Sequence, residues 1–316
     1  MLPIQVTVVF IAIYVLESLA IIVQSSLIVA VLGREWVQVK RMSPVEMILI
    51  SLGSCRFCLQ WSSVLYNFCS YFNPDWVFWY IGIIWEFTNT LSFWLTSLLA
   101  VVYCVKIASF THPIFFWLRW RILRLVPWLL LGSLLTSCVT IIFSAIRNYI
   151  TVKLMSVKHF PRNNTVTERL QTVLQNFLIS QQMVVLTIPF LLFVASTIVL
   201  ISSLFQHLGQ MQQHSSGHGN SSMKAQSTAL RSLAVFLVFF ISYFLTILVS
   251  ARDSLFEKTT WFWVWQIIIY AVVSIHSTSL MLSNPKLKKV LKVRCWGQRM
   301  SEAPGTRPPG QMGVCI

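Results

Sequence analysis

Seven stretches of apolar sequence, spread from one end of the chain to the other, limit what this protein can fold into. They lie near residues 6–32, 46–70, 81–105, 126–146, 183–205, 233–252 and 262–283. Each can cross about 30 Å of hydrocarbon as an α-helix, which rises about 1.5 Å per residue. Only 10% of the 316 residues are charged, whereas about a quarter of a soluble domain is charged. We therefore predict an all-α bundle of seven transmembrane helices.

The basic residues of the loops predict how this bundle is oriented. Most of the 24 Lys and Arg residues follow the first, third or fifth helix or lie in the C-terminal tail. Cytoplasmic loops carry such an excess, so we expect an extracellular N-terminus and a cytoplasmic C-terminus. The net charge of +15 does not indicate nucleic-acid binding, because the cations lie in short runs between apolar segments.

A glycosylation sequon tests the same orientation. Asn163-Asn164-Thr165 falls in the second extracellular loop, so we predict a glycan on Asn163. The sequon at Asn220 falls in the third cytoplasmic loop and should stay bare. We expect that loop, 206–227, to be a mobile linker because it is rich in Gln, His, Ser and Gly.

The even spread of the apolar stretches predicts one domain, residues 1–295, followed by a Pro- and Gly-rich disordered tail at 296–316. The sequence contains no nucleophile elbow, P-loop or HExxH motif. We therefore expect no enzyme, and we expect neither a metal nor a cofactor. Without an internal repeat, the chain does not resemble an inverted-repeat transporter.

Charged residues inside membrane helices are candidates for function, because each costs roughly 3 kcal/mol at mid-helix. Arg56 lies about 15 Å deep in the second helix. From there it can reach either Glu17 or Gln24 of the first helix. One interpretation is a polar clamp that holds helices 1 and 2 together. The other is a pairing that rearranges when the protein is activated.

Near the outer end of the third helix, an acid, an amide and aromatic rings share one helical face. Glu86, Asn89 and Phe93 follow each other at i, i+3 and i+7, beside Trp85 and Trp94. Such a face suits a polar organic ligand, which we favour, and the alternative is a contact between helices. The residues that we expect to complete a binding ring are Gln181, Phe240, Tyr243, Gln266 and Tyr270.

Several long motifs resemble the taste receptor type 2 family, the bitter taste receptors. They are ILISLGSCRF at 48–57, YCVKIASFTHP at 103–113, FWLRWRI at 116–122, and HSTSL at 276–280 followed by NPKLK at 284–288. The resemblance covers nearly all of residues 1–295. The segments at 14–18 and 24–36 resemble in particular the family member that responds to β-glucopyranosides such as salicin. Gln24 stands where most members of the family have Asn.

The resemblance implies a G-protein-coupled receptor in the plasma membrane of taste receptor cells. Its ligand would be a small bitter agonist of the glucoside type. Its partners would be a heterotrimeric G protein of the gustducin type and the surrounding membrane lipids. Lys106, Arg119 and Arg121, together with Tyr103, follow or end the third helix, where a G protein would dock. The cations could instead serve only to set topology. The alternatives to this function are a vomeronasal pheromone receptor and, with less support, a membrane transporter.

Overall fold

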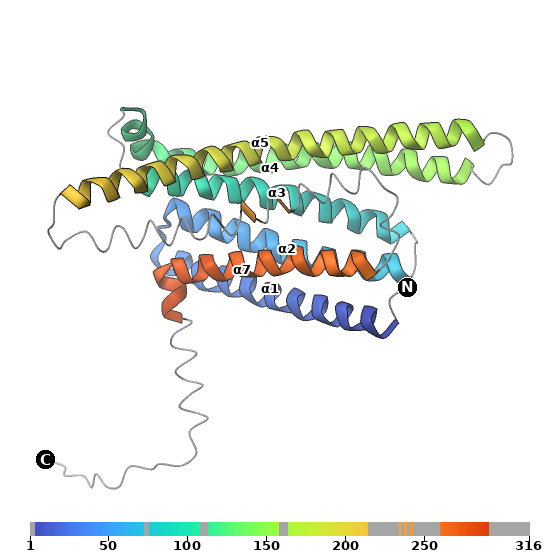
Figure 1. The fold of residues 1–316 in the computed structure, drawn as a ribbon, viewed down its shortest axis with the longest axis horizontal. Helices are drawn as coiled ribbons and strands as arrows, with labels where there is room; N and C mark the ends of the chain where they lie inside the picture. Colours follow the sequence, from blue (N-terminus) through green and yellow to red (C-terminus); the bar gives the residue numbers. More distant parts are fainter. Residues whose placement is uncertain are drawn as a thin grey trace, which may run out of the picture.

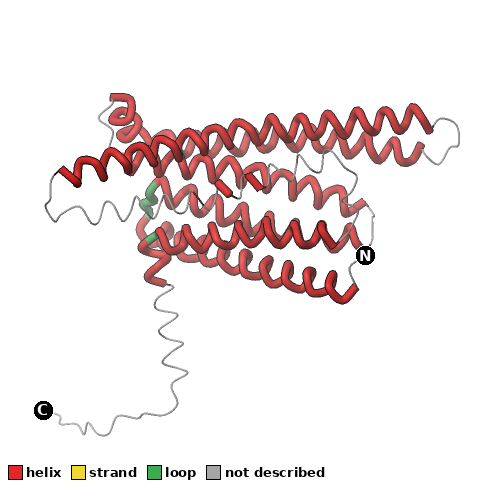
Figure 2. The backbone as a smooth tube through the Cα atoms, viewed as in Figure 1, coloured by secondary structure: helices red, strands yellow, loops and turns green. Residues whose placement is uncertain are grey.

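A computed structural model describes residues 4–72, 76–107, 113–157, 164–213, 234, 237–238, 241–242 and 260–290. Helices make up almost all of these residues, and no strand occurs among them (Figure 2). The helices are α1 (Ile4–Val39), α2 (Pro44–Phe72), α3 (Trp76–Ile107), α4 (Pro113–Val157), α5 (Asn164–Gln213) and α7 (Thr260–Ser283).

Six helices of the described part are long and apolar enough to cross a membrane. They match six of the seven predicted spans. The remaining predicted span, 233–252, is described only at 234, 237–238 and 241–242, and these positions are helical.

The helices lie side by side with α3 in the middle of the bundle (Figure 1). It contacts α2 on one side and α4 and α5 on the other, while α1 packs against α2 and α7. We call the end where α7 finishes the C-terminal end of the bundle and the opposite end the N-terminal end. One apolar cluster around Phe193 and Tyr270 fills the N-terminal half. Another, around Leu52 and Leu99, fills the C-terminal half.

A short turn joins α1 to α2. Lys40 ends α1 with a φ of 53°, a left-handed conformation that ends many helices. Ser43 then caps α2: Glu46 N–H donates to Ser43 Oγ at 3.3 Å and Ser43 N–H donates to Glu46 Oε2 at 2.9 Å. This is a capping box with Pro44 at the first helical position. Further along, a Cβ at Gly53 would lie 3.1 Å from Val29 Cγ2, so glycine lets α1 and α2 approach closely.

Two helices are longer than the sequence predicts. α4 continues to Val157 although its predicted span ends at 146, and α5 begins at Asn164 although its predicted span begins at 183. At its other end α5 continues to Gln213, where we expected a mobile linker from residue 206. The C-terminal end of α4 and the N-terminal end of α5 lie side by side and project beyond the other helices in Figure 1. Hydropathy marks the apolar part of a helix, whereas the Gln residues at 206–213 are polar but have good helix propensity and prolong it.

Candidate ligand and coupling sites

A hydrogen-bonded network joins α1, α2 and α7 in the N-terminal half of the bundle. Ser63 Oγ lies 3.0 Å from Tyr14 Oη and 2.5 Å from Tyr270 Oη, and Asn67 donates to Tyr14 Oη at 2.9 Å. The Tyr14 ring also meets the rings of Tyr270 and Trp263, each with centroids 5.6 Å apart. Tyr270, which we predicted to line the ligand site, is therefore a buried member of the seam between three helices.

Arg56 is buried, but its partners are not those expected from the sequence. Its Nη1 donates to Ser277 Oγ at 2.7 Å, and its Nη2 lies 2.8 Å from His276 Nδ1. Since an arginine can only donate, Nδ1 of His276 accepts, which places the histidine proton on Nε2. The predicted pairing of Arg56 with Glu17 or Gln24 is wrong: Arg56 ties α2 to α7 and not to α1.

Gln24 also bonds to α7. Its Nε2 donates to Ser274 Oγ at 3.2 Å and to Thr278 Oγ1 at 3.1 Å. Gln24 of α1 and Arg56 of α2 thus form hydrogen bonds with neighbouring residues of the same part of α7. The sequence reasoning did not consider the hydroxyl groups of a helix far along the chain as partners.

The predicted ligand face of α3 lies at the N-terminal end of the bundle. Trp85 stacks on Tyr66 of α2, with ring centroids 6.0 Å apart and planes at 13°. Glu86 is half-buried and Asn89, one turn further, is buried. The hydroxyl of the neighbouring Thr88 bonds within its own helix, to the carbonyls of Ile84 and Trp85. An acid and an amide therefore lie beside a stacked aromatic pair, as a site for a polar organic molecule requires.

The deeper aromatic residues of this face lie in the core. Phe93 is 1% exposed and packs in the apolar cluster with Phe193. Trp94 is half-buried, and its Nε1 is buried without a hydrogen-bond partner. A buried polar group of this kind is usually bonded, so Trp94 Nε1 is a donor that a bound molecule could satisfy.

The other predicted ring residues lie on α5, on α7 and outside the described residues. Gln181 of α5 and Gln266 of α7 are half-buried. Phe240 and Tyr243 lie outside the described residues.

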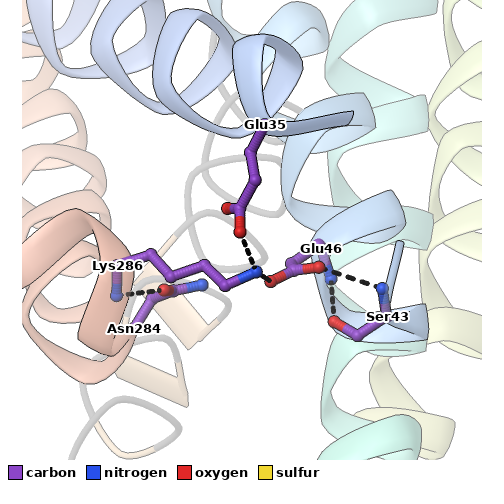
Figure 3. Close-up of polar contacts among 5 residues, drawn as sticks. All are labelled: Glu35, Ser43, Glu46, Asn284 and Lys286. Atoms are coloured by element: carbon purple, nitrogen blue, oxygen red, sulfur yellow. Dashed lines mark hydrogen bonds and ion pairs between the residues drawn. The ribbon is translucent and has the colours of Figure 1, made fainter. Parts of the chain in front are cut away.

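At the C-terminal end, one cation joins three segments (Figure 3). Lys286 Nζ lies 2.5 Å from Glu35 Oε1 of α1 and 2.7 Å from Glu46 Oε1 of α2. The hydrogen bonds to these two carboxylates raise the pKa of Lys286. Asn284 holds the lysine in place, because its Oδ1 accepts from Lys286 N–H at 3.0 Å at the start of the short helix 285–290.

The residues predicted to meet a G protein are close in sequence but differ in exposure where the structure describes them. Lys106 is exposed in the last turn of α3, and Tyr103 is half-buried against the apolar cluster of the C-terminal half. Arg121 is exposed on α4, with its guanidinium carbon 4.8 Å from the centroid of the Trp117 ring. The side chain of Arg119 lies outside the described part.

Sequence reasoning missed several residues of these sites. Ser43 and Glu46 have the S-x-x-E spacing of a capping box, a signal that is readable in the sequence. Tyr14, Ser63 and Asn67 gave no such signal, because hydroxyl and amide side chains are common in membrane helices and only packing brings these three together.

Comparison with known proteins adds to this geometry. The family model described as "Taste receptor protein (TAS2R)" matches residues 1–298. Taste receptor type 2 member 16 of Homo sapiens is 61% identical over 295 residues, which cover 93% of this chain and 100% of the relative. The protein of the same name from Rattus norvegicus is 53% identical over 301 residues, 95% of this chain and 100% of the relative. Taste receptor type 2 member 143 of Rattus norvegicus is 40% identical over 93% of this chain and 100% of the relative.

Proposed function

Because the chain belongs to the taste receptor type 2 family, we propose that it is a bitter taste receptor for β-glucopyranosides such as salicin. Members of the family are multi-pass membrane receptors of seven helices that respond to small molecules and act through G proteins. For this chain we propose a gustducin-type G protein and the plasma membrane of taste receptor cells. Membership leaves no ground for the pheromone receptor or the transporter considered from the sequence.

The observation that carries the ligand proposal is the position of Glu86. It is a half-buried acid inside the membrane-spanning part of α3, about 9 Å from Tyr80, where that part begins. An acid at such a depth needs a polar environment. A sugar hydroxyl can donate to the carboxylate, Asn89 can bind a second hydroxyl, and the stacked rings of Trp85 and Tyr66 offer a surface to an aglycone.

The coupling proposal places the G protein at the C-terminal end of the bundle, beside Tyr103 and Lys106. A docking helix presents unpaired carbonyl groups at its own C-terminus, and a cation such as Lys106 suits them. Arg119 belongs to the same proposed surface. Arg121 was predicted for the same role, but its exposed position over Trp117 makes this role a separate question.

The ligand proposal is tested by concentration-response curves for salicin and for glucosides with other aglycones. Cells expressing the chain with a promiscuous Gα would be assayed by calcium mobilisation, normalised to surface expression. A hydrogen bond to a charged group contributes about 1.5–3 kcal/mol, which corresponds to about tenfold to a hundredfold in affinity. We expect Glu86→Ala to raise the half-maximal concentration by this factor, and Glu86→Gln by less because it keeps one acceptor.

Glu17→Gln is the matched control, because Glu17 is also a half-buried acid in a membrane-spanning helix, but on α1. It should leave the curves unchanged. An unchanged half-maximal concentration for every glucoside with Glu86→Ala would remove Glu86 from the proposed ligand site. A wild-type protein that responds to no β-glucoside would overturn the proposed ligand class itself.

A further inference from the structure

Three tryptophans and two arginines form a stripe along the first part of α4. Trp117, Trp120, Arg121, Arg124 and Trp128 follow each other at i, i+3, i+4, i+7 and i+11, so they share one side of the helix. All five are exposed: Trp120 by 83%, Trp128 by 72% and Trp117 by 51%. We call these five residues the α4 stripe.

The α4 stripe faces away from the rest of the bundle. The residues by which α4 packs are different ones: Val126 is 0% exposed, and the small buried residues of the following turns are Ser133, Ser137, Thr140 and Ser144. Ile122, between the arginines in sequence, packs against the apolar cluster of the C-terminal half. The stripe is therefore not a contact between helices.

The depth of the α4 stripe places it where hydrocarbon gives way to lipid headgroups. The apolar span of α4 begins at Arg124, so Trp117, Trp120 and Arg121 lie just before it and Trp128 one turn inside it. Tryptophan is enriched at this boundary. The stripe lies at the C-terminal end of the bundle, on the side to which the basic loops assign the cytoplasm.

The charge of the α4 stripe comes from Arg121 and Arg124. No carboxylate among the residues that the structure describes pairs with Arg121 or Arg124. Arg121 is instead fixed over the Trp117 ring, 4.8 Å from its centroid, an arrangement that orients the guanidinium. Two cations beside three exposed tryptophan rings suit an anionic partner that also has an apolar part.

We propose that the α4 stripe binds an anionic phospholipid of the surrounding leaflet. The guanidinium groups of Arg121 and Arg124 would bind the headgroup phosphates in bidentate fashion, while Trp117 and Trp120 pack along the glycerol and Trp128 along the acyl chains. A G protein fits the stripe less well, because its docking helix enters between the helices of the bundle and the stripe faces outward. Anionic lipids are concentrated in the cytoplasmic leaflet.

The experiment is a titration of the full-length chain in phosphatidylcholine nanodiscs with phosphatidylinositol 4,5-bisphosphate, phosphatidylserine and additional phosphatidylcholine. Bound lipids are counted by native mass spectrometry. We expect the bisphosphate lipid to bind most tightly and phosphatidylcholine least. Each arginine near a charged headgroup contributes about fivefold in affinity, so the double variant Arg121→Gln/Arg124→Gln should bind the bisphosphate lipid about twentyfold or more weakly. Adding salt should weaken binding to the wild type more than to the double variant.

Arg169→Gln is the matched control, because Arg169 is an exposed arginine at the opposite end of the bundle. It should bind all three lipids as the wild type does. Trp117→Ala leaves both charges in place and should weaken binding by a smaller factor, through loss of the ring that orients Arg121. The inference is overturned if the double variant and Arg169→Gln behave alike, or if all three lipids bind equally. It is also overturned if Arg121→Gln loses G-protein signalling with unchanged lipid binding, since that would make Arg121 a coupling residue.

Discussion

Two parts of the bundle use their polar side chains in different ways. In α1, α2 and α7, polar groups bond from helix to helix, as Ser63 does to Tyr270 at 2.5 Å and Arg56 to Ser277 at 2.7 Å. In α4 and α5, several hydroxyls of the described residues instead donate to a carbonyl of their own helix. Ser137 donates to Ser133 O at 2.8 Å and Thr197 to Phe193 O at 2.8 Å. Lipid does not push helices together as water does, so hydrogen bonds between helices and close packing decide which helices stay joined.

This difference in hydrogen bonding indicates which helices can move. A hydroxyl that bonds to its own helix is satisfied without a neighbour, so it does not resist movement of that helix. The hydrogen bond from Ser97 of α3 to the carbonyl of Pro189 at 2.7 Å does link α5 to the rest. We expect α1, α2 and α7 to act as a frame and α4 and α5 to shift against it at lower cost when an agonist binds.

The largest effect should come from removing Arg56. Arg56→Ala takes a hydrogen bond from Ser277 and another from His276 and leaves a cavity between α2 and α7. Each buried polar group that loses its partner costs about 1–3 kcal/mol, so for two such groups we expect a loss of about 2–6 kcal/mol. Surface expression measured by flow cytometry should fall severalfold. Arg124→Ala, at an exposed arginine of α4, should reach the surface normally. If the two variants express equally, the frame does not depend on Arg56.

Ser63→Ala should have a medium effect. It removes one hydroxyl that bonds to both Tyr14 and Tyr270, and interhelical bonds in membranes contribute about 0.6 kcal/mol each and at most about 1.7. We expect about 1–2 kcal/mol, seen as a lower melting temperature of the purified protein. Ser137→Ala is the sharpest comparison, because Ser137 is 0% exposed but bonds within α4. A larger loss with Ser137→Ala than with Ser63→Ala would contradict the distinction between the two parts.

The ion pairs of Lys286 should contribute less, although they join α1, α2 and the segment after α7. The lysine side chain is 42% exposed, and water screens such pairs to about 0.2–1 kcal/mol each. We expect Lys286→Gln to lower the melting temperature slightly. The raised pKa of Lys286 means that its contribution is complete below the ordinary lysine value and is lost only as the pH rises through the raised one.

Melting curves at about pH 6 and pH 8 should therefore show the same difference between Lys286→Gln and the wild type. Lys289→Gln, at an exposed lysine of the same short helix, is the control and should melt like the wild type. A difference that disappears by pH 8 would show that Lys286 is not held by Glu35 and Glu46 in the folded protein.

The sequence was sufficient for the fold because hydropathy and helix length are local properties. Six predicted spans are confirmed by helices, and the motifs that resemble the taste receptor type 2 family are confirmed by a family match over residues 1–298. The partner of Arg56 could not be found in this way. Its bond to His276 joins residues 220 positions apart, and nothing local to either residue says how α2 and α7 are rotated against each other.

The same limit explains Phe93 and Tyr270. Both were expected at a binding site because aromatic residues suit one, yet an aromatic ring suits a core equally well, and Phe93 is 1% and Tyr270 5% exposed. Spacing along a helix shows which residues share a face. Which neighbour covers that face depends on the packing of the other helices, and a single sequence does not contain that information in readable form.

The smallest effect on stability, and the one that tests orientation, concerns the connection between α4 and α5. Asn163 lies outside the described residues, in the sequence between the end of α4 at Val157 and the start of α5 at Asn164. These two helix ends project beyond the other helices in Figure 1. If the C-terminal end of the bundle is cytoplasmic, as the basic loops predict, these projecting ends face the lumen during synthesis and Asn163 can receive a glycan.

Glycosidase treatment should then increase the electrophoretic mobility of the wild type and leave that of Asn163→Gln unchanged. Asn220→Gln should behave like the wild type. All three proteins should melt at nearly the same temperature, because the glycan would be attached outside the frame of α1, α2 and α7. A glycan that persists in Asn163→Gln and disappears in Asn220→Gln would reverse the orientation, and with it the assignment of the α4 stripe to the cytoplasmic leaflet.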